Sequence, residues 1–532
     1  MQTNNICLVC YLDQDNLGVG YLASSLLETG CFDITLVNMR EKTPEIIKGI
    51  VDSKPLIVGF SVVFQAQLED FQRLITTLRE NGVNCHFTAG GHYPSLRYEE
   101  LMQLIPELDS VVLFEGERTI IELAKAIQKN IEWQSVDGIA YRMNGTIKRN
   151  ALRPLENDLD CFPLPVRRPV RPVIFGQKVI NLLAGRGCYY KCSFCSIQRF
   201  YSEPPGKVKR IRRPENVARE IQLHYEQEGC TIFIFQDDDF PLVVHDAHDW
   251  VEEFCGQLQK RNLADHIMWK ISCRVTEIDE RLFSKLTSCG LGMVYLGIES
   301  GTLNGLQSMN KRITPEDSLT AVGILKRLEL PFEFGFMMFE PFITFDSLRS
   351  NVDFLLQLCG DGSASVGLAR MLALAGTEIE DTLRAQNRLF GQPPLEDYGF
   401  LDSRLDECYE MLSTVFATWM HDEWGFMNFS RWARLQSEAL QRFGGNQKEA
   451  AFAKETLKNV VSSANQYLLN TVVSVADLVQ SGLNNYDKYS QISSVTSKKH
   501  NEFCGQLTAL ATHVEGLAGV KYWPALMNNS VC

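Results

Sequence analysis

Three cysteines lie close together in the segment Gly-Arg-Gly-Cys-Tyr-Tyr-Lys-Cys-Ser-Phe-Cys-Ser, residues 185–196. They are Cys188, Cys192 and Cys195, and the nearest histidine along the chain is His224. A structural zinc site requires four nitrogen or sulfur ligands, and a thioredoxin-like redox site uses two thiols. An iron–sulfur cluster on three thiolates explains both the number of cysteines and the missing fourth ligand, because the remaining iron can bind a substrate or cofactor. The alternative, three core cysteines on a loop, is disfavoured by the spacing.

The composition indicates a globular protein of several domains. The chain has 532 residues, of which 45% are hydrophobic and 22% are charged, so two to four domains are expected. The 52 basic and 65 acidic residues give a net charge of −13, which argues against a nucleic-acid partner or an anionic membrane surface.

The sequence also predicts where the protein resides. We expect no signal peptide, because no basic segment followed by a long apolar run opens the chain. We expect no membrane span, because no apolar run approaches about 20 residues. The 16 cysteines are irregularly spaced, which favours a reducing, cytoplasmic setting over a disulfide framework.

Short strands and helices alternate over residues 1–150, which predicts a doubly wound, Rossmann-like parallel sheet. The expected strands are 6–11, 32–37, 56–63, 84–89 and 108–114, and the expected helices are 17–29, 67–81 and 119–128. Five prolines and several arginines follow in residues 151–177, which indicates an extended linker.

A second alternating series over residues 178–395 predicts a partial (β/α)6 barrel, with functional residues at the carboxyl ends of its strands. The expected strands are 179–183, 231–235, 268–273, 293–298, 332–339 and 365–374, and the expected helices are 214–225, 250–258, 280–287, 315–328 and 348–358. Residues 396–532 read as a mainly helical C-terminal domain with an aromatic cluster of Trp419, Trp424, Phe426, Phe429 and Trp432.

The spacing Cys188-x-x-x-Cys192-x-x-Cys195, with Phe194 before the last cysteine, resembles the signature of the radical S-adenosylmethionine (SAM) enzymes. The resemblance implies a 4Fe–4S cluster on the three thiolates and SAM bound at the fourth iron. It also implies reductive cleavage of SAM to a 5′-deoxyadenosyl radical that abstracts a hydrogen from the substrate. An electron donor such as flavodoxin or ferredoxin would supply the electron.

Other strand ends match the same family. Asp237 and Asp238 follow the second barrel strand, where carboxylates suit the amino group of SAM, although a solvated acidic turn is the alternative. Arg274 follows the third strand and suits the SAM carboxylate, unless it pairs with Glu277 or Asp279. The resemblance further assigns to SAM Glu299, Ser300, Gly335 and Leu372, of which the last two would wall the adenine or form barrel core.

The N-terminal segment resembles the cobalamin-binding-type domain that precedes many radical SAM barrels. The resemblance rests on four fragments in order: Leu17 to Ala23, Gly59-Phe60-Ser61, Gly90-Gly91-His92 and Glu115-Gly116-Glu117. It implies that Ser61, Gly90, Gly91, Glu115 and Gly116 belong to a cobalamin-type site, with Gln65 and His92 nearby. No Asp-x-His-x-x-Gly segment supplies a histidine ligand, and His92 is not expected to act as one.

The reaction is less constrained by the sequence. One hypothesis is cobalamin-dependent methyl transfer to carbon in the tailoring of a specialised metabolite or peptide. A second is a cobalamin-independent radical enzyme, such as a peptide epimerase with Cys408, Cys359 or Cys504 as the hydrogen donor, although a buried structural cysteine is the better prediction for each. Another radical rearrangement or carbon–carbon bond formation also stays open. A non-catalytic iron–sulfur protein is disfavoured by the intact cysteines and Glu299.

Overall fold

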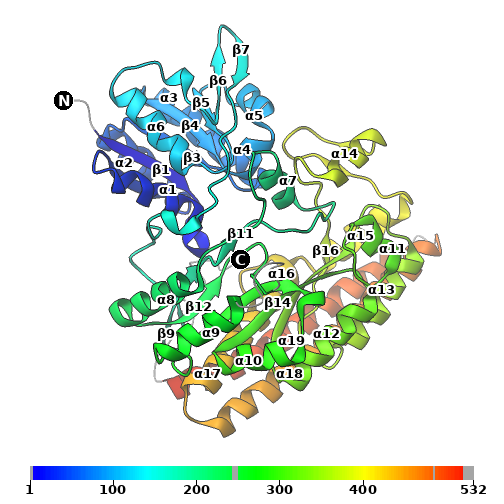
Figure 1. The fold of residues 1–532 in the computed structure, drawn as a ribbon. Helices are drawn as coiled ribbons and strands as arrows, with labels where there is room; N and C mark the ends of the chain where they lie inside the picture. Colours follow the sequence, from blue (N-terminus) through cyan, green and yellow to red (C-terminus); the bar gives the residue numbers. More distant parts are fainter. Residues whose placement is uncertain (1–3, 243–249, 483–485, 519–532) are drawn as a thin grey trace. The chain divides into compact units, whose positions relative to one another are not determined.

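The computed structural model describes residues 4–242, 250–482 and 486–518, and these form two compact units. The first unit comprises residues 1–170, 185–212 and 373–397, and the second comprises residues 171–184, 213–372 and 398–532. The cysteine segment therefore belongs to the same compact unit as the N-terminal sheet (Figure 1).

A seven-stranded sheet forms the centre of the first unit, with strand order β2-β1-β3-β4-β5-β6-β7. The strands are β1 (Asn5–Cys10), β2 (Asp33–Asn38), β3 (Ile57–Ser61), β4 (His86–Gly90), β5 (Ser110–Val112), β6 (Ile139–Met143) and β7 (Thr146–Arg149). The first five are mutually parallel, which confirms the predicted sheet. The hairpin β6–β7 is antiparallel and was not predicted. Its signal was the dipeptide Asn144-Gly145, whose positive φ angles of 51° and 77° suit a tight hairpin turn.

Helices cover both faces of this sheet (Figure 1). They are α1 (Leu17–Glu28), α2 (Thr43–Ser53), α3 (Leu68–Glu80), α4 (His92–Leu96), α5 (Tyr98–Leu104) and α6 (Glu117–Gln128). One buried apolar cluster includes residues of α2, α3 and α5, and a second includes residues of α1 and α6. Helix α2 was not predicted, although its buried Ile46 and Ile50 lie four residues apart, as residues on one helix face do.

The second unit contains another seven-stranded sheet, with order β16-β15-β14-β13-β12-β9-β8. The strands are β8 (Val173–Ile174), β9 (Gln177–Leu182), β12 (Cys230–Phe235), β13 (Met268–Arg274), β14 (Leu291–Glu299), β15 (Phe332–Phe339) and β16 (Ala369–Arg370). All neighbours are parallel except β8, which pairs antiparallel with β9. The helices between the strands are α8 (Pro214–Glu228), α9 (Trp250–Lys260), α10 (Glu280–Ser288), α11 (Leu303–Ser308), α12 (Pro315–Arg327) and α13 (Phe345–Cys359).

This arrangement confirms the predicted partial barrel, with one correction. The sixth strand was expected over residues 365–374, but β16 contains only two residues, paired with Met337 and Phe339. The chain leaves the sheet at once, since Ala373 already belongs to the first unit, and Leu372 is 64% exposed. An apolar run alone does not indicate how many of its residues find a hydrogen-bonding neighbour.

The C-terminal part is helical, as predicted. It comprises α15 (Arg404–Val415), α16 (Ala417–His421), α17 (Phe426–Phe443), α18 (Gln447–Gln480) and α19 (Tyr486–Ala518), while α14 (Glu378–Ala385) belongs to the first unit. Trp419 is 1% exposed, and its ring contacts those of Phe416, Phe426 and Phe503. Of the remaining predicted aromatics, Trp424 and Trp432 each contact Phe429.

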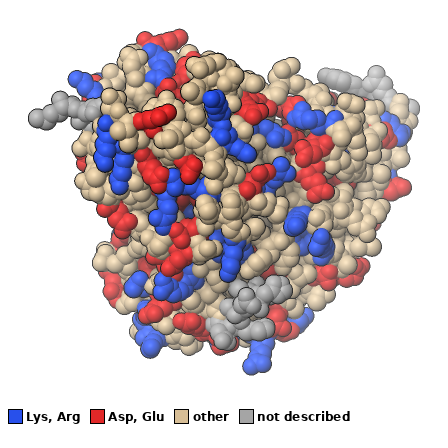
Figure 2. Space-filling view, turned by 45° about the horizontal axis from the view of Figure 1, so that its top comes forward, with Lys and Arg blue, Asp and Glu red and all other residues tan. Residues whose placement is uncertain are grey.

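The surface and the helices agree with the sequence in two respects. On the face shown in Figure 2, acidic and basic side chains are intermixed over most of the surface. Among the described residues, no helix is long and apolar enough to span a membrane.

Gly91 gives a direct test of the first sheet's packing. Its φ is +113°, and a Cβ atom there would lie 2.4 Å from the carbonyl oxygen of Val62. We predict that Gly91→Ala lowers the free energy of unfolding by about 2 kcal/mol or more, because backbone strain and a collision with backbone add. Urea denaturation followed by circular dichroism measures this change.

The matched control is Gly82→Ala. Gly82 has a φ of +79°, but a Cβ there would meet no atom within 4 Å, so only the backbone strain remains. Equal destabilisation by the two substitutions would contradict the predicted collision.

Candidate cofactor sites

The three cysteines lie in a loop that begins and ends at a very short two-stranded ribbon. Strand β10 (Gly185–Arg186) pairs antiparallel with β11 (Arg210–Ile211), and the three cysteines lie between them. Gly187 permits the tight closure, because its φ is +81° and a Cβ there would lie 2.0 Å from the carbonyl oxygen of Val208. Helix α7 (Ser196–Ser202) begins directly after Cys195.

The cysteine side chains suit an iron–sulfur cluster. Cys188, Cys192 and Cys195 are reduced and partly exposed, as is Phe194, and the amide of Cys195 donates to the carbonyl of Cys192 at 3.1 Å. Among the described residues, no three His, Cys, Asp or Glu side chains are grouped so as to hold a metal ion. A 4Fe–4S cluster does not require such convergence, since each thiolate binds a different iron, so the donor set fits this group.

The residues predicted for a cobalamin-type site gather at one edge of the first sheet. Ser61 and Gly90 are paired neighbours at the carboxyl ends of β3 and β4, and Gly91 follows. Gly116 precedes α6, and a Cβ there would lie 3.1 Å from the side chains of Leu22 and Val112. Parallel strands bring their carboxyl ends to one edge, where α/β proteins bind ligands.

Two side chains at this edge have partners within the first unit. His92 stacks on Phe200 of α7, with ring centroids 4.2 Å apart and an angle of 9° between the planes. Gln65 donates to the carbonyl of Ala373 at 3.5 Å and accepts from the amide of Ala375 at 2.9 Å. These contacts bind the cysteine loop and residues 373–397 to the sheet, while the expectation that His92 is not a metal ligand stays a prediction.

Glu115 also has partners. Its carboxylate accepts hydrogen bonds from Arg186 and Arg210, and Arg186 also pairs with Glu117 at 2.7 Å. Burial alone raises the pKa of Glu115, but the two guanidinium groups outweigh burial and hold that pKa below its usual value. Local sequence patterns could not reveal this, because Arg210 lies 95 residues away along the chain.

Glu299 is the centre of the second unit's candidate site. It ends β14 with a φ of +69°, and the amide of Ser300 donates to the carbonyl of Ile298 at 2.9 Å. The resulting γ-turn with positive φ is rare and strained, a feature that concentrates at functional sites. Lys311 donates to Oε1 of Glu299 at 2.9 Å, and both side chains are largely buried.

Two paired glycines make room for the Glu299 carboxylate. Gly297 and Gly335 are neighbours on β14 and β15. A Cβ at Gly297 would lie 2.8 Å from Glu299 Oε1 and 2.5 Å from Lys311 Nζ, and a Cβ at Gly335 would lie 3.0 Å from Glu299 Oε2. Gly335, which was predicted to wall the adenine of SAM or to form barrel core, lies beside this carboxylate. The glycines therefore place Glu299 over the inner face of the sheet.

Tyr295 belongs to this group and was missed as a site residue. A Cβ at Gly335 would lie 2.9 Å from its hydroxyl, so the hydroxyl is close to Glu299 Oε2. Burial, reinforced by the charge of Glu299, raises the pKa of Tyr295 to about 12, so the phenol is protonated at neutral pH. Strand alternation would have found it, because residues 295, 297 and 299 share one face.

The predicted site residues at the ends of β12, β13 and β14 differ in their burial and in their hydrogen-bond partners. Arg274 is buried and donates through its guanidinium to the carbonyl of Lys311, while its own amide donates to Glu277 at 3.0 Å. Asp237 is buried and accepts from the amide of Ala184 at 3.0 Å, whereas Asp238 is exposed. Ser300 is buried, and its hydroxyl donates to Asn351 at 3.3 Å.

All three predicted hydrogen-donor cysteines lie in helices, and Cys359 is the last residue of α13. Cys359 and Cys408 are fully buried in α13 and α15, and burial raises the pKa of each thiol to about 12. The thiol of Cys359 donates to the carbonyl of Leu355 in its own helix at 3.4 Å. Cys504 is partly exposed and lies 3.4 Å from His500. The first two environments match the structural alternative.

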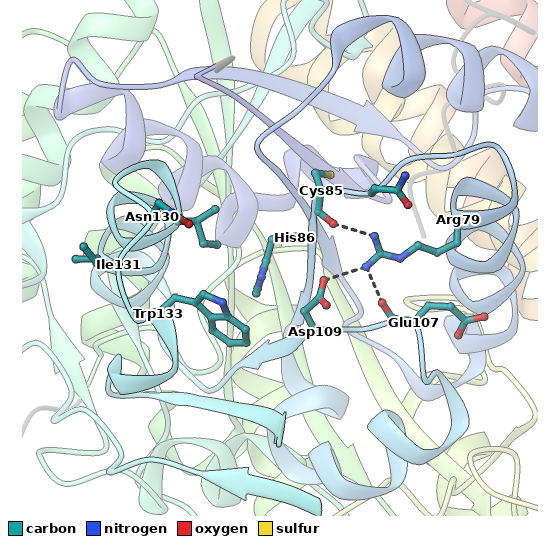
Figure 3. Close-up of a pocket in the computed structure, with 10 residues that line it drawn as sticks. Arg79, Cys85, His86, Glu107, Asp109, Asn130, Ile131 and Trp133 are labelled. Atoms are coloured by element: carbon teal, nitrogen blue, oxygen red, sulfur yellow. Dashed lines mark hydrogen bonds and ion pairs between the residues drawn. The ribbon is translucent and has the colours of Figure 1, made fainter. Parts of the chain in front are cut away.

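One pocket of about 560 Å³ lies away from these sites, at the amino end of β4. His86 and Trp133 contact each other edge to face at 4.6 Å within it (Figure 3). Arg79 donates to the carbonyl oxygens of Val83, Cys85 and Glu107 and to Asp109, as the dashed lines show in part. The guanidinium of Arg79 is therefore already engaged in hydrogen bonds and an ion pair within the protein.

Comparison with protein families agrees with both sites. Residues 5–124 match the B12 binding domain family, and residues 182–355 match the radical SAM superfamily. The chain belongs to the radical SAM enzymes that carry an N-terminal B12-binding domain. Its cofactors are therefore cobalamin, a 4Fe–4S cluster and SAM, which confirms the cofactor predictions.

Named relatives and a solved structure extend the comparison. An uncharacterized methyltransferase of Pyrococcus horikoshii is 29% identical over 354 residues, which cover 64% of this chain and 73% of the relative. An anaerobic magnesium-protoporphyrin IX monomethyl ester cyclase of Rubrivivax gelatinosus is 28% identical over 58% of this chain and 56% of the relative, so the chain spans about half of that protein. The cobalamin-dependent SAM radical enzyme OxsB, with aqua-cobalamin bound, has the same fold, with a TM-score of 0.67 and 19% identity over 99% of this chain and 83% of that one.

Proposed function

We propose that this enzyme transfers a methyl group from SAM to a carbon atom of a small molecule or peptide, with cobalamin as the carrier, in the tailoring of a specialised metabolite. The observation that carries the proposal is the presence of a B12-binding domain and a radical SAM domain in one chain. The name of the relative from Pyrococcus horikoshii, a methyltransferase, supports methyl transfer. The domain boundaries predicted at residues 150, 177 and 395 remain part of this proposal.

The cysteine loop and the second sheet have separate roles in this proposal. Cys188, Cys192 and Cys195 hold the cluster, because three thiolates leave one iron open to SAM. Glu299 accepts hydrogen bonds from SAM, since its carboxylate lies over the inner face of the sheet. Arg274 and Asp237 are buried at neighbouring strand ends and contribute charge to the same edge.

The cofactors supply the radical and the methyl group, and the chain's own residues orient them and exclude water. The buried Glu299–Lys311 pair keeps a charged carboxylate available in a poorly solvated place. An external reductant, such as flavodoxin or ferredoxin, supplies the electron.

Loading the cofactors tests the central assignment. Anaerobic reconstitution with iron, sulfide and hydroxocobalamin, followed by desalting and absorbance spectroscopy, should leave corrin bands beside the broad absorbance of the cluster. Cys192→Ala should remove the cluster absorbance and SAM cleavage, because a ligand is lost, whereas Cys31→Ala should not, because Cys31 is exposed on the surface of the first unit. A Cys192→Ala protein with a normal cluster that still cleaves SAM would contradict the ligand assignment.

Glu299 is tested by SAM affinity. We predict that Glu299→Gln weakens SAM binding by about 10- to 100-fold, because a charge-assisted hydrogen bond contributes about 1.5–3 kcal/mol. Equilibrium dialysis of the reconstituted protein with labelled SAM measures this loss. The matched control is Glu280→Gln, since Glu280 forms an exposed ion pair with Arg327 at 2.7 Å. Equal affinities of the two variants would overturn the role of Glu299.

A second candidate is a cobalamin-dependent radical reaction without methyl transfer. The relative from Rubrivivax gelatinosus is named a cyclase and aligns with 58% of this chain, which favours this candidate over the cysteine-dependent epimerase. Methyl transfer consumes SAM to S-adenosylhomocysteine, whereas radical formation alone gives 5′-deoxyadenosine. The product profile therefore distinguishes the two candidates.

A further inference from the structure

We propose that Glu115 is a positioning residue that holds both ends of the cysteine loop against the edge of the B12-binding sheet. The cluster ligands and the cobalamin-type edge are then carried by one rigid body, and their separation is set by a buried ionic contact. This inference rests on the proposed function for its purpose, but its physical content concerns only residues of the first unit.

The contact uses both oxygens of Glu115. Oε1 accepts from Arg186 Nη1 at 3.0 Å and from Arg210 Nη2 at 2.9 Å, and Oε2 accepts from Arg210 Nη1 at 2.8 Å. Arg210 therefore forms a two-pronged contact with the carboxylate, the geometry that gives such pairs their strength and direction. Arg186 completes the group by pairing with Glu117, so two cations meet two carboxylates.

The group is enclosed by aromatic rings and has little contact with water. The side chains of Arg210 and Glu115 are 1% and 11% exposed. The guanidinium of Arg186 lies 4.9 Å from the ring centroid of Tyr21, and that of Arg210 lies 5.2 Å from that of Tyr201. Removing a single member of such a buried group is strongly destabilising, because the remaining charges would stay buried without compensation.

The two arginines lie opposite each other on the two strands from which the cysteine loop extends. Arg186 and Arg210 are directly paired in the ribbon β10–β11, and all three cysteines lie between them. The ribbon contains only two residue pairs, and an isolated ribbon so short is not stable by itself. Glu115 binds both strands of the ribbon and so supplies the closure that the ribbon lacks.

The backbone before Glu115 is strained in a way that fixes its direction. Phe114 has a φ of +60°, which is unusual for a bulky residue, and its amide donates to Ser95 Oγ at 2.7 Å. The ring of Phe114 also packs on Phe200 of α7, with centroids 5.3 Å apart. The turn that aims Glu115 at the arginines therefore also contacts the helix that follows Cys195.

The loop is also held at Ser193, which limits what Glu115 must do. The amide of Ile379 donates to the carbonyl of Ser193, between the second and third cysteines, at 3.0 Å. Loss of the Glu115 contact should thus loosen the base of the loop without unfolding the unit. Glu115→Gln keeps the side chain's shape but removes the charge that both guanidinium groups need.

Hydrogen exchange of the full chain as isolated, without added cofactors, tests the inference. We expect amides of residues 187–209 in Glu115→Gln to exchange at least 10-fold faster than in the natural chain, while those of β3 (57–61) are unchanged. Arg210→Lys should give a smaller increase, because an ammonium keeps the charge but loses the two-pronged contact. The matched control, Glu122→Gln, breaks an ion pair with Arg153 on the surface of the same unit and should change neither segment.

A spectroscopic readout links this change to the cluster. After reconstitution, Glu115→Gln should broaden the electron paramagnetic resonance signal of the reduced cluster, because the ligands are less fixed, while Glu122→Gln leaves it unchanged. Unchanged exchange at 187–209, or equal acceleration at 57–61, would overturn the positioning role. Because the exchange measurement needs no cofactor, it remains decisive even if the natural chain retains no corrin and the proposed function fails.

Discussion

A carboxylate buried at the carboxyl end of a parallel strand is stabilised by a buried cation beside it, and each unit of this protein contains such a pair. Glu115 follows β5 and binds two arginines, and Glu299 ends β14 and binds Lys311. In both places a residue with positive φ, Phe114 or Glu299 itself, turns the chain out of the strand. The desolvation of each carboxylate is offset by charge, and its direction is fixed by strained backbone.

The two carboxylates have different consequences for chemistry. The carboxylate of Glu299 lies beside Gly297 and Gly335, and the hydroxyl of Tyr295 lies beside Gly335 as well. Glu115 accepts three hydrogen bonds from two arginines of the protein. We therefore propose a binding role for Glu299 in one sheet and a positioning role for Glu115 in the other.

The sequence predicted most of the architecture because buried parallel strands and amphipathic helices leave clear periodic patterns. The prediction was wrong where the hydrophobic pattern of the sequence did not match the pairing of the strands. The run 365–374 is apolar, yet only Ala369 and Arg370 find a partner strand. The hairpin at 139–149 has short strands, and its Asn-Gly turn was its strongest signal.

The sequence predicted some residues of the candidate site but did not indicate the contacts of others. The cysteines and Glu299 lie in compact motifs, so their types and spacing were informative. The partners of Glu115 lie 71 and 95 residues away along the chain, so no local sequence pattern could indicate these contacts. The family resemblance assigned Leu372 to SAM, and the structure places this exposed side chain just beyond the short strand β16.

The measurement that tests the account most directly is a single turnover without substrate. The anaerobic protein, loaded with cluster and corrin and then reduced, is mixed with excess SAM, and S-adenosylhomocysteine is quantified against bound corrin. The account predicts a rapid burst of about one equivalent per corrin and none from protein loaded with cluster alone. Formation of 5′-deoxyadenosine without any such burst would contradict methyl transfer through cobalamin.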